Sequence, residues 1–167
     1  MSDRLAQLSQ LLGHHLTQSQ AILTTAESCT GGGIAKALTD ISGCSAYFEG
    51  GFVTYSEQSK QRFLGVLPDT LYQFGVVSEN VAKEMAEGAC HAFSANYAIS
   101  VTGYAGPGGG TEDMPVGTVC FGFASPGHTT THTCHFSGNR EAIRQQAVVF
   151  ALTTALETFF KIKLDTV

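Results

Sequence analysis

Hydrophobic residues recur at helical spacing near both ends of the chain. Leu5, Leu8, Leu12 and Leu16 are three or four positions apart, which predicts an amphipathic helix over about 4–17. Towards the other end, apolar residues at comparable intervals predict a long final helix that contains Ile143, Ala147, Phe150, Ala151 and Leu156. Each helix therefore has an apolar face that must pack against another element.

Apolar runs between these helices predict strands. They cover 21–25, 46–55 with an interruption at Gly50-Gly51, 97–102, 116–124 and 128–136. The last two alternate in polarity, and Ser125-Pro126-Gly127 between them predicts a hairpin.

Further helices are predicted from Ile34 to about Ile41, after Ser56 and after Ser78, where the serines are suitable N-caps. Helices and strands alternate early in the chain, and the antiparallel hairpin comes late. We therefore predict an α/β fold: one three-layer α/β/α domain over 1–167, built around a mixed sheet.

The composition narrows the possible partners. Charged residues make up only 14% of the chain and hydrophobic ones 43%, so we expect a homodimer or a larger homo-oligomer. The net charge is −5 and none of the nine lysines and arginines is adjacent to another, which argues against a nucleic-acid partner. No apolar run is long enough to span a membrane, and Met1–Leu5 lacks the pattern of a signal peptide, so we expect a cytoplasmic protein.

The segment Glu27-Ser28-Cys29-Thr30-Gly31-Gly32 connects a predicted strand to a predicted helix. A serine at this point lies where backbone amides and the helix dipole favour an anion, which suits a nucleophile whose intermediate needs an oxyanion hole. The alternative is a tight turn in which Ser28 merely caps the helix. The Walker pattern is absent, because no Gly-Lys-Ser/Thr follows.

A serine nucleophile needs a base, and Lys60 is the best candidate. Lys60 follows the strand that ends at Tyr55, and strand ends and helix starts of an α/β sheet meet at one edge, so its amine can reach Ser28. The alternative is a solvated surface lysine. A metal site formed by His128, His132 and Cys134 requires ligands too far apart along one strand, so we expect neither a metal nor a cofactor.

A second glycine-rich loop runs from Gly103 to Gly110 at the end of another predicted strand. Thr102 offers a hydroxyl there, and Gly103 and Gly106 offer accessible amides. Arg140 begins the last helix, where a guanidinium and helix amides together suit a phosphate. An arginine that simply follows a surface loop is the alternative.

Four blocks of sequence resemble the CinA C-terminal-domain family: Ala26–Gly32, Phe48–Ser56, Thr102–Thr111 and Pro115–Val119. The resemblance extends from about Leu5 to Leu156. Stand-alone members of this family are nicotinamide mononucleotide deamidases, and no preceding domain is expected here. Four residues depart from the usual family pattern: Glu57, Tyr104, Met114 and Asn139.

The resemblance implies metal-free hydrolysis of the carboxamide of nicotinamide mononucleotide, with Ser28 as nucleophile and Lys60 as base. Tyr55 is an alternative proton donor to the departing ammonia. The amides of Cys29, Thr30 and Gly31 are expected to hold the oxyanion, and Glu27 to balance the pyridinium charge or to orient the loop. The expected substrate-binding positions are Glu27, Cys29, Thr30, Gly31, Gly32, Thr102, Gly103, Ala105, Gly106 and Arg140.

Two other readings remain open. A non-catalytic pyridine-nucleotide-binding paralogue, acting as a sensor or regulator, would use the same phosphate-binding loops. An interaction domain for DNA uptake or repair rests only on the family's name, and the acidic charge balance argues against direct contact with DNA.

Overall fold

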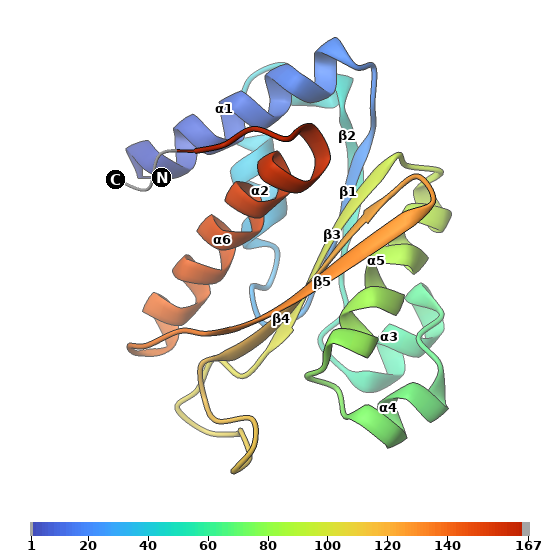
Figure 1. The fold of residues 1–167 in the computed structure, drawn as a ribbon, viewed down its shortest axis with the longest axis vertical. Helices are drawn as coiled ribbons and strands as arrows, with labels where there is room; N and C mark the ends of the chain where they lie inside the picture. The colour runs from blue at the N-terminus through green and yellow to red at the C-terminus, as the bar shows by residue number, and fades with distance from the viewer. Residues whose placement is uncertain (1, 165–167) are drawn as a thin grey trace.

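A five-stranded mixed sheet lies between two layers of helices, which confirms the predicted α/β/α architecture (Figure 1). The computed structural model describes residues 2–164; Met1 and 165–167, at the ends of the predicted domain, lie outside the described residues. The strands are β1 (Leu23–Glu27), β2 (Phe48–Val53), β3 (Tyr97–Gly103), β4 (Thr118–Ser125) and β5 (His128–His135). The helices are α1 (Asp3–Gln18), α2 (Gly33–Thr39), α3 (Glu57–Leu64), α4 (Pro68–Phe74), α5 (Glu79–Phe93) and α6 (Arg140–Phe160), with a 3₁₀ turn at Cys44–Ala46.

The strand order is β2-β1-β3-β4-β5, and the loops that follow β1, β2 and β3 leave the sheet at the same end. Strand β1 pairs in parallel with β2 on one side and β3 on the other, whereas β4 and β5 extend the sheet in antiparallel fashion. The chain therefore leaves β1 for one neighbour and later returns to pair with it on the opposite side. Such a switch point opens a crevice beyond the carboxyl ends of the strands, which is where open α/β sheets bind ligands.

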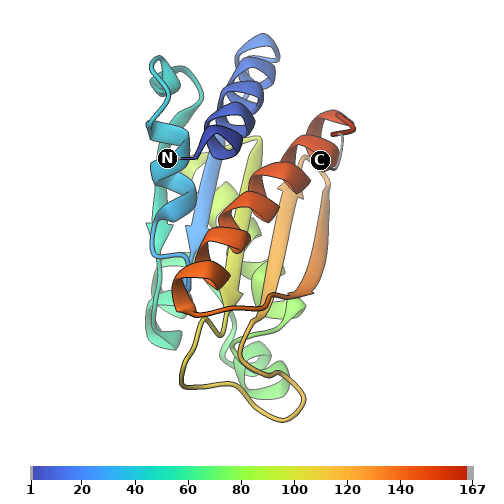
Figure 2. The ribbon, with the colours of Figure 1, turned by 90° about the vertical axis from the view of Figure 1, so that its left-hand side faces the viewer.

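The two sheet faces are covered by different helices. Helices α1, α2 and α6 cover one face, and α3, α4 and α5 lie on the other (Figures 1 and 2). The apolar faces predicted for the first and last helices are buried in one core, since Leu8, Leu12 and Leu16 of α1 pack with Ile143 and Leu152 of α6. Met85 and Val81 of α5 form a second core on the other face.

The structure corrects the sequence-based description of two strands. Strand β1 begins and ends two residues later than predicted, so that Ser28 follows it directly. Strand β2 is continuous through Gly50 and Gly51, where an interruption was predicted, although one extra residue bulges in its pairing with β1. These glycines serve packing, because an added Cβ at Gly51 would collide with the Thr25 side chain and one at Gly50 with the Phe93 ring.

Helix α4 has no counterpart in the sequence-based prediction. It is seven residues long, begins with Pro68 and has no side-chain N-cap, so it carries little of the periodic signal that marks longer helices. The capped helices were predicted correctly: Ser56 and Ser78 both accept hydrogen bonds from their helix N-termini. Within residues 2–164, no helix is long and apolar enough to cross a membrane.

Candidate active site

Ser28 occupies the turn between β1 and α2. Its N–H donates to the Val101 carbonyl of β3 at 3.0 Å, so the strand pairing positions its backbone. The Gly31 N–H closes the turn by donating to the Ser28 carbonyl at 2.9 Å, and Gly31 and Gly32 have φ of +60° and +98°, which glycine adopts without steric cost. The Ser28 side chain is left slightly exposed, in the wall of a cavity.

Lys60 is fully buried and directed at this serine. Helix α3 begins with a capping box between Ser56 and Ser59, which places Lys60 on the first turn. Its Nζ donates to Ser28 Oγ at 3.0 Å and to the Thr54 carbonyl at 2.6 Å. Burial lowers the pKa of Lys60 from 10.5 to about 8, although the nearby Glu57 carboxylate acts in the opposite direction.

Cys29 places a thiol in the same cavity wall. Burial raises the pKa of its thiol from 9.0 to about 12. With this raised pKa the thiol of Cys29 stays protonated at neutral pH. Since the thiolate is the reactive form of cysteine, Cys29 is a poor nucleophile. The hydroxyl of Ser28, with its lysine partner, is therefore the better nucleophile.

The cavity beside Ser28 and Lys60 has a volume of about 220 Å³. Its only basic side chains among the described residues are Lys60 and Arg140, and no carboxylate lines it, so it favours an anionic group. The lining residues come from the end of β3, from the connections that follow β1, β2, β3 and α4, and from helices α3 and α6: Ser28, Cys29, Tyr55, Lys60, Val76, Val77, Thr102, Gly103, Tyr104, Ala105, Gly106, Gly108 and Arg140.

Arg140 connects two loops at this cavity. One terminal nitrogen donates to the Gly106 carbonyl and the other to the Tyr55 hydroxyl, both at 2.8 Å. Arg140 is the first residue of α6, whose N-cap Asn139 accepts a hydrogen bond from the Ala142 N–H. Asparagine caps as well as aspartate does, so the departure at Asn139 preserves this helix start.

Glu27 orients the loop and takes no part in the cavity wall. Its fully buried carboxylate accepts hydrogen bonds from the Thr30 hydroxyl at 2.6 Å and from the N–H groups of Ile34 and Ala35 at 2.9 and 3.0 Å. The side chain therefore faces the start of α2 on the far side of the turn. Of the two roles considered from the sequence, the contacts support loop orientation.

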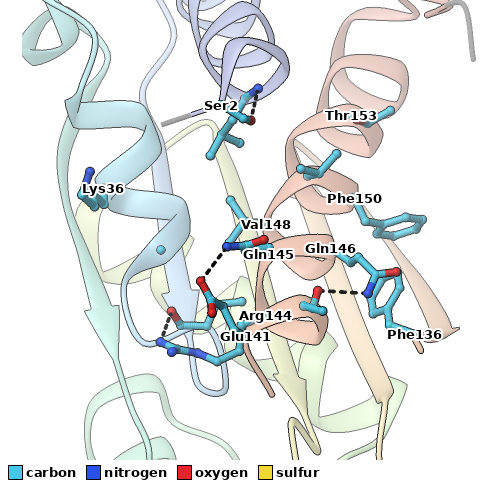
Figure 3. Close-up of a pocket in the computed structure, with 15 residues that line it drawn as sticks. Ser2, Lys36, Phe136, Glu141, Arg144, Gln145, Gln146, Val148, Phe150 and Thr153 are labelled. Atoms are coloured by element: carbon cyan, nitrogen blue, oxygen red, sulfur yellow. Dashed lines mark hydrogen bonds between the residues drawn. The ribbon is translucent and has the colours of Figure 1, made fainter. Parts of the chain in front are cut away.

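A larger hollow of about 990 Å³ lies along α6, beside α2 and the start of α1 (Figure 3). It is larger than the cavity beside Ser28, but the described residues that line it bring no nucleophile and base together. Lys36 in its wall pairs with Asp40, and Gln145 donates to Glu141. We therefore take the cavity beside Ser28 and Lys60 as the candidate active site.

Comparison with known proteins identifies the family. The family model of the CinA C-terminal domain matches residues 5–159. The chain belongs to the CinA C-terminal domain family. The nicotinamide-nucleotide amidohydrolase PncC of Enterobacter agglomerans is 55% identical over 159 residues, which are 95% of this chain and 97% of that protein. PncC of Escherichia coli K12 is 52% identical, covering 96% of this chain and 99% of that protein. A crystal structure titled competence/damage inducible protein CihA, from Agrobacterium tumefaciens, superposes with a TM-score of 0.91 at 40% identity, over 93% of this chain and 96% of that one.

Within this CinA C-terminal domain, the structure brings together most of the residues predicted for the site. Ser28, Lys60, Tyr55 and Arg140 all face one cavity, as do Cys29, Thr102, Gly103, Ala105 and Gly106. Four predicted substrate-binding positions are not in its wall: Glu27, Thr30, Gly31 and Gly32. The Thr102 hydroxyl donates to the Val76 carbonyl at 2.9 Å, so its hydrogen bond links β3 to the chain between α4 and α5.

The predicted oxyanion donors are also reduced from three to two. The Gly31 N–H is occupied by the Ser28 carbonyl. The N–H groups of Cys29 and Thr30 donate to no other residue within the described part of the chain. Cys29 lines the cavity, and although Thr30 is not among the lining residues, its N–H belongs to the peptide group that begins with the Cys29 carbonyl, so these two N–H groups are the candidates.

Four cavity residues escaped sequence reasoning. Tyr104 and Gly108 lie inside the glycine-rich loop Gly103–Gly110, so the local sequence does mark their position. Val76 and Val77 lie between α4 and α5, where no pattern marks a site and only the tertiary structure places them. His128, His132 and Cys134 do not form a metal-binding group, and no other set of three His, Cys, Asp or Glu within residues 2–164 does so.

Proposed function

We propose that this CinA C-terminal domain hydrolyses the carboxamide of nicotinamide mononucleotide to nicotinate mononucleotide and ammonia. The observation that carries the proposal is the buried Lys60 amine, 3.0 Å from the Ser28 hydroxyl and with its pKa lowered to about 8. Relatives that align over nearly their whole length are named nicotinamide-nucleotide amidohydrolases, which supplies the substrate.

The first half of the reaction acylates Ser28. At pH 7 about a tenth of Lys60 is neutral, and this form takes the Ser28 hydroxyl proton as Oγ bonds to the carboxamide carbon. The carbonyl oxygen becomes an oxyanion held by the amides of Cys29 and Thr30. The C–N bond then breaks, and the protonated Lys60 returns its proton to the departing nitrogen, which leaves as ammonia.

The second half releases the acid. Neutral Lys60 takes a proton from water as its oxygen attacks the acyl carbon, and the collapse of the intermediate breaks the bond to Ser28 Oγ. Lys60 then returns the proton to Ser28. We assign the proton transfers to Lys60, because the Tyr55 hydroxyl already accepts a hydrogen bond from Arg140 and Tyr55 as a whole is 60% exposed, whereas Lys60 is fully buried beside Ser28.

In this proposal the cavity encloses one end of the nucleotide and leaves the other end outside its enclosed part. Its volume of about 220 Å³ is below the roughly 300–1,000 Å³ of pockets that enclose an entire ligand. The carboxamide and ring occupy the enclosed part, and the phosphate extends to Arg140 and the start of α6. The pyridinium charge also makes the carbonyl carbon more electrophilic.

The protein also functions as a homodimer or a larger homo-oligomer in this proposal. Large apolar side chains are exposed close together in sequence on and beside β2, α3 and α4, and a partner subunit would cover them: Val53, Tyr55, Phe63, Leu67, Tyr72 and Phe74. Light scattering on the purified protein tests this state.

The decisive experiment incubates the purified protein with nicotinamide mononucleotide in metal-free buffer containing a chelator. Equal amounts of ammonia and nicotinate mononucleotide are expected, and nicotinamide itself serves as the comparison substrate without ribose or phosphate. A melting-temperature shift with the nucleotide but no ammonia would instead identify a non-catalytic pyridine-nucleotide-binding paralogue.

A further inference from the structure

Arg144 contacts the nucleophile loop from the side opposite the reaction cavity. It lies one helical turn after Arg140 on α6, in the wall of the larger hollow, and extends towards the chain that enters α2 (Figure 3). Its Nε donates to the Cys29 carbonyl at 3.0 Å, and a terminal nitrogen donates to the Thr30 carbonyl at 3.3 Å. Nothing in the sequence pattern marks it as different from other helix arginines.

We propose that Arg144 is a positioning residue that holds the oxyanion-binding amides of the Ser28 loop in their reactive orientation. This inference rests on the proposed function and adds a residue to its machinery. The C=O and N–H of a peptide group lie in one plane and turn together, so a contact that holds the oxygen also fixes the direction of the N–H.

Two peptide groups have a tethered oxygen and an N–H that donates to no other described residue. In the first, the Ser28 carbonyl is held by the Gly31 N–H, and the group carries the Cys29 N–H. In the second, the Cys29 carbonyl is held by Arg144, and the group carries the Thr30 N–H. Arg144 thus directly holds the carbonyl oxygen of the peptide group that carries the Thr30 N–H, one of the two candidate oxyanion donors.

The second hydrogen bond of Arg144 holds the next peptide group of the loop. The Thr30 carbonyl accepts from Arg144 and also from the Gly33 N–H at 3.0 Å, and its group carries the Gly31 N–H, which closes the turn on Ser28. The forked guanidinium therefore spans two successive carbonyls, which fixes both peptide planes with respect to α6. A lysine has no planar fork and cannot reproduce this geometry.

The packing around Arg144 is built for this contact. An added Cβ at Gly31 would lie 3.1 Å from the Arg144 guanidinium, and one at Gly33 would lie 3.0 Å from the Val148 side chain. The glycines therefore allow α6 to approach the loop. The positive charge behind the carbonyls also polarises the peptide groups, which strengthens their N–H groups as donors to a developing negative charge.

The test compares Arg144→Ala and Arg144→Lys with the wild type on nicotinamide mononucleotide, with Gln145→Ala as a matched control from the same helix and the same hollow. We expect kcat to fall by about tenfold to a hundredfold in Arg144→Ala, with KM within about threefold of wild type, because the oxyanion forms only in the transition state. Gln145→Ala should retain wild-type kcat. Millimolar guanidinium should restore part of the kcat of Arg144→Ala, because the hollow leaves room for it beside the loop.

The outcomes separate this role from a structural one. A wild-type kcat in Arg144→Ala overturns the inference. So does a loss of kcat that follows a fall in melting temperature and is not rescued by guanidinium, or full activity of Arg144→Lys. If the wild type itself releases no ammonia, the proposed function fails, and that result is visible before any variant is compared.

Discussion

The Nζ atom of Lys60 lies 3.0 Å from the Oγ atom of Ser28, although 32 positions separate the residues in sequence. The two meet because β1 and β2 are parallel neighbours, so the segments that follow them emerge at the same edge of the sheet. Burial then gives the lysine the property that a base requires, a pKa lowered to about 8.

Replacing Ser28 tests the nucleophile. Ser28→Ala should lower the rate of ammonia release by about three orders of magnitude or more, because among the described residues that line the cavity only the Ser28 hydroxyl is hydrogen-bonded to a lysine amine. Binding of the nucleotide should persist, measured as a melting-temperature shift. Ser125→Ala, at the end of β4, is the control that should keep full activity. Near-normal turnover by Ser28→Ala would point to direct attack by water.

Activity should depend on pH through Lys60. The amine acts as a base only when neutral, so kcat/KM should rise with pH through about 8 and then level off. Lys60→Arg remains charged and should be as inactive as Lys60→Ala, whereas Lys83→Arg on the exposed face of α5 should be active. Measuring ammonia release from pH 6 to 10, roughly the range over which such a lysine titrates, provides the profile. A flat profile, or an active Lys60→Arg, would place the base elsewhere.

The same burial should cost stability. The folded-state pKa of Lys60, about 8, is below its ordinary value of 10.5, so the unfolded chain binds more protons between these values. The loss of stability is fully present below pH 8 and disappears as the pH rises towards 10.5. The lowering of the pKa from 10.5 to about 8 corresponds to roughly 3 kcal/mol in the free energy of unfolding.

Lys60→Met should therefore raise the free energy of unfolding at pH 7 by about 1–3 kcal/mol, since the lost hydrogen bond to Thr54 offsets part of the gain. The advantage over wild type should shrink as the pH approaches about 10. Urea unfolding of both proteins at neutral and alkaline pH measures it. A difference that does not change with pH would mean that the pKa of Lys60 is not lowered in the folded protein.

Arg140 should contribute to substrate binding through the phosphate. Arg140→Ala should raise KM for nicotinamide mononucleotide far more than for nicotinamide riboside, which has no phosphate. The comparison should yield an interaction energy of about 1.5–3 kcal/mol, typical of a charge-assisted hydrogen bond. Tyr55→Phe removes one acceptor of the guanidinium and should have a smaller effect of the same kind. Equal losses on both substrates would show that Arg140 mainly joins the Tyr55 and Gly106 loops.

Local sequence signals were sufficient for most of the elements. Helical spacing marked α1 and α6, and serine caps marked the starts of α3 and α5, because these features depend on neighbours within a few residues. The same reasoning failed at Gly50 and Gly51, which look like a break in a strand. They are glycines because Phe93 and Thr25, distant in sequence, leave no room for a Cβ.

The sequence by itself determined the α/β class, the serine at the end of the first strand and the family resemblance that pairs Ser28 with Lys60. Only the tertiary structure decided three features of the site. The Glu27 carboxylate faces α2 and not the cavity, the Gly31 N–H donates to the Ser28 carbonyl within the turn, and Arg144 donates to the Cys29 carbonyl. Each of these depends on the direction of a side chain or a peptide plane. Packing between distant elements sets that direction, and residue order does not encode it locally.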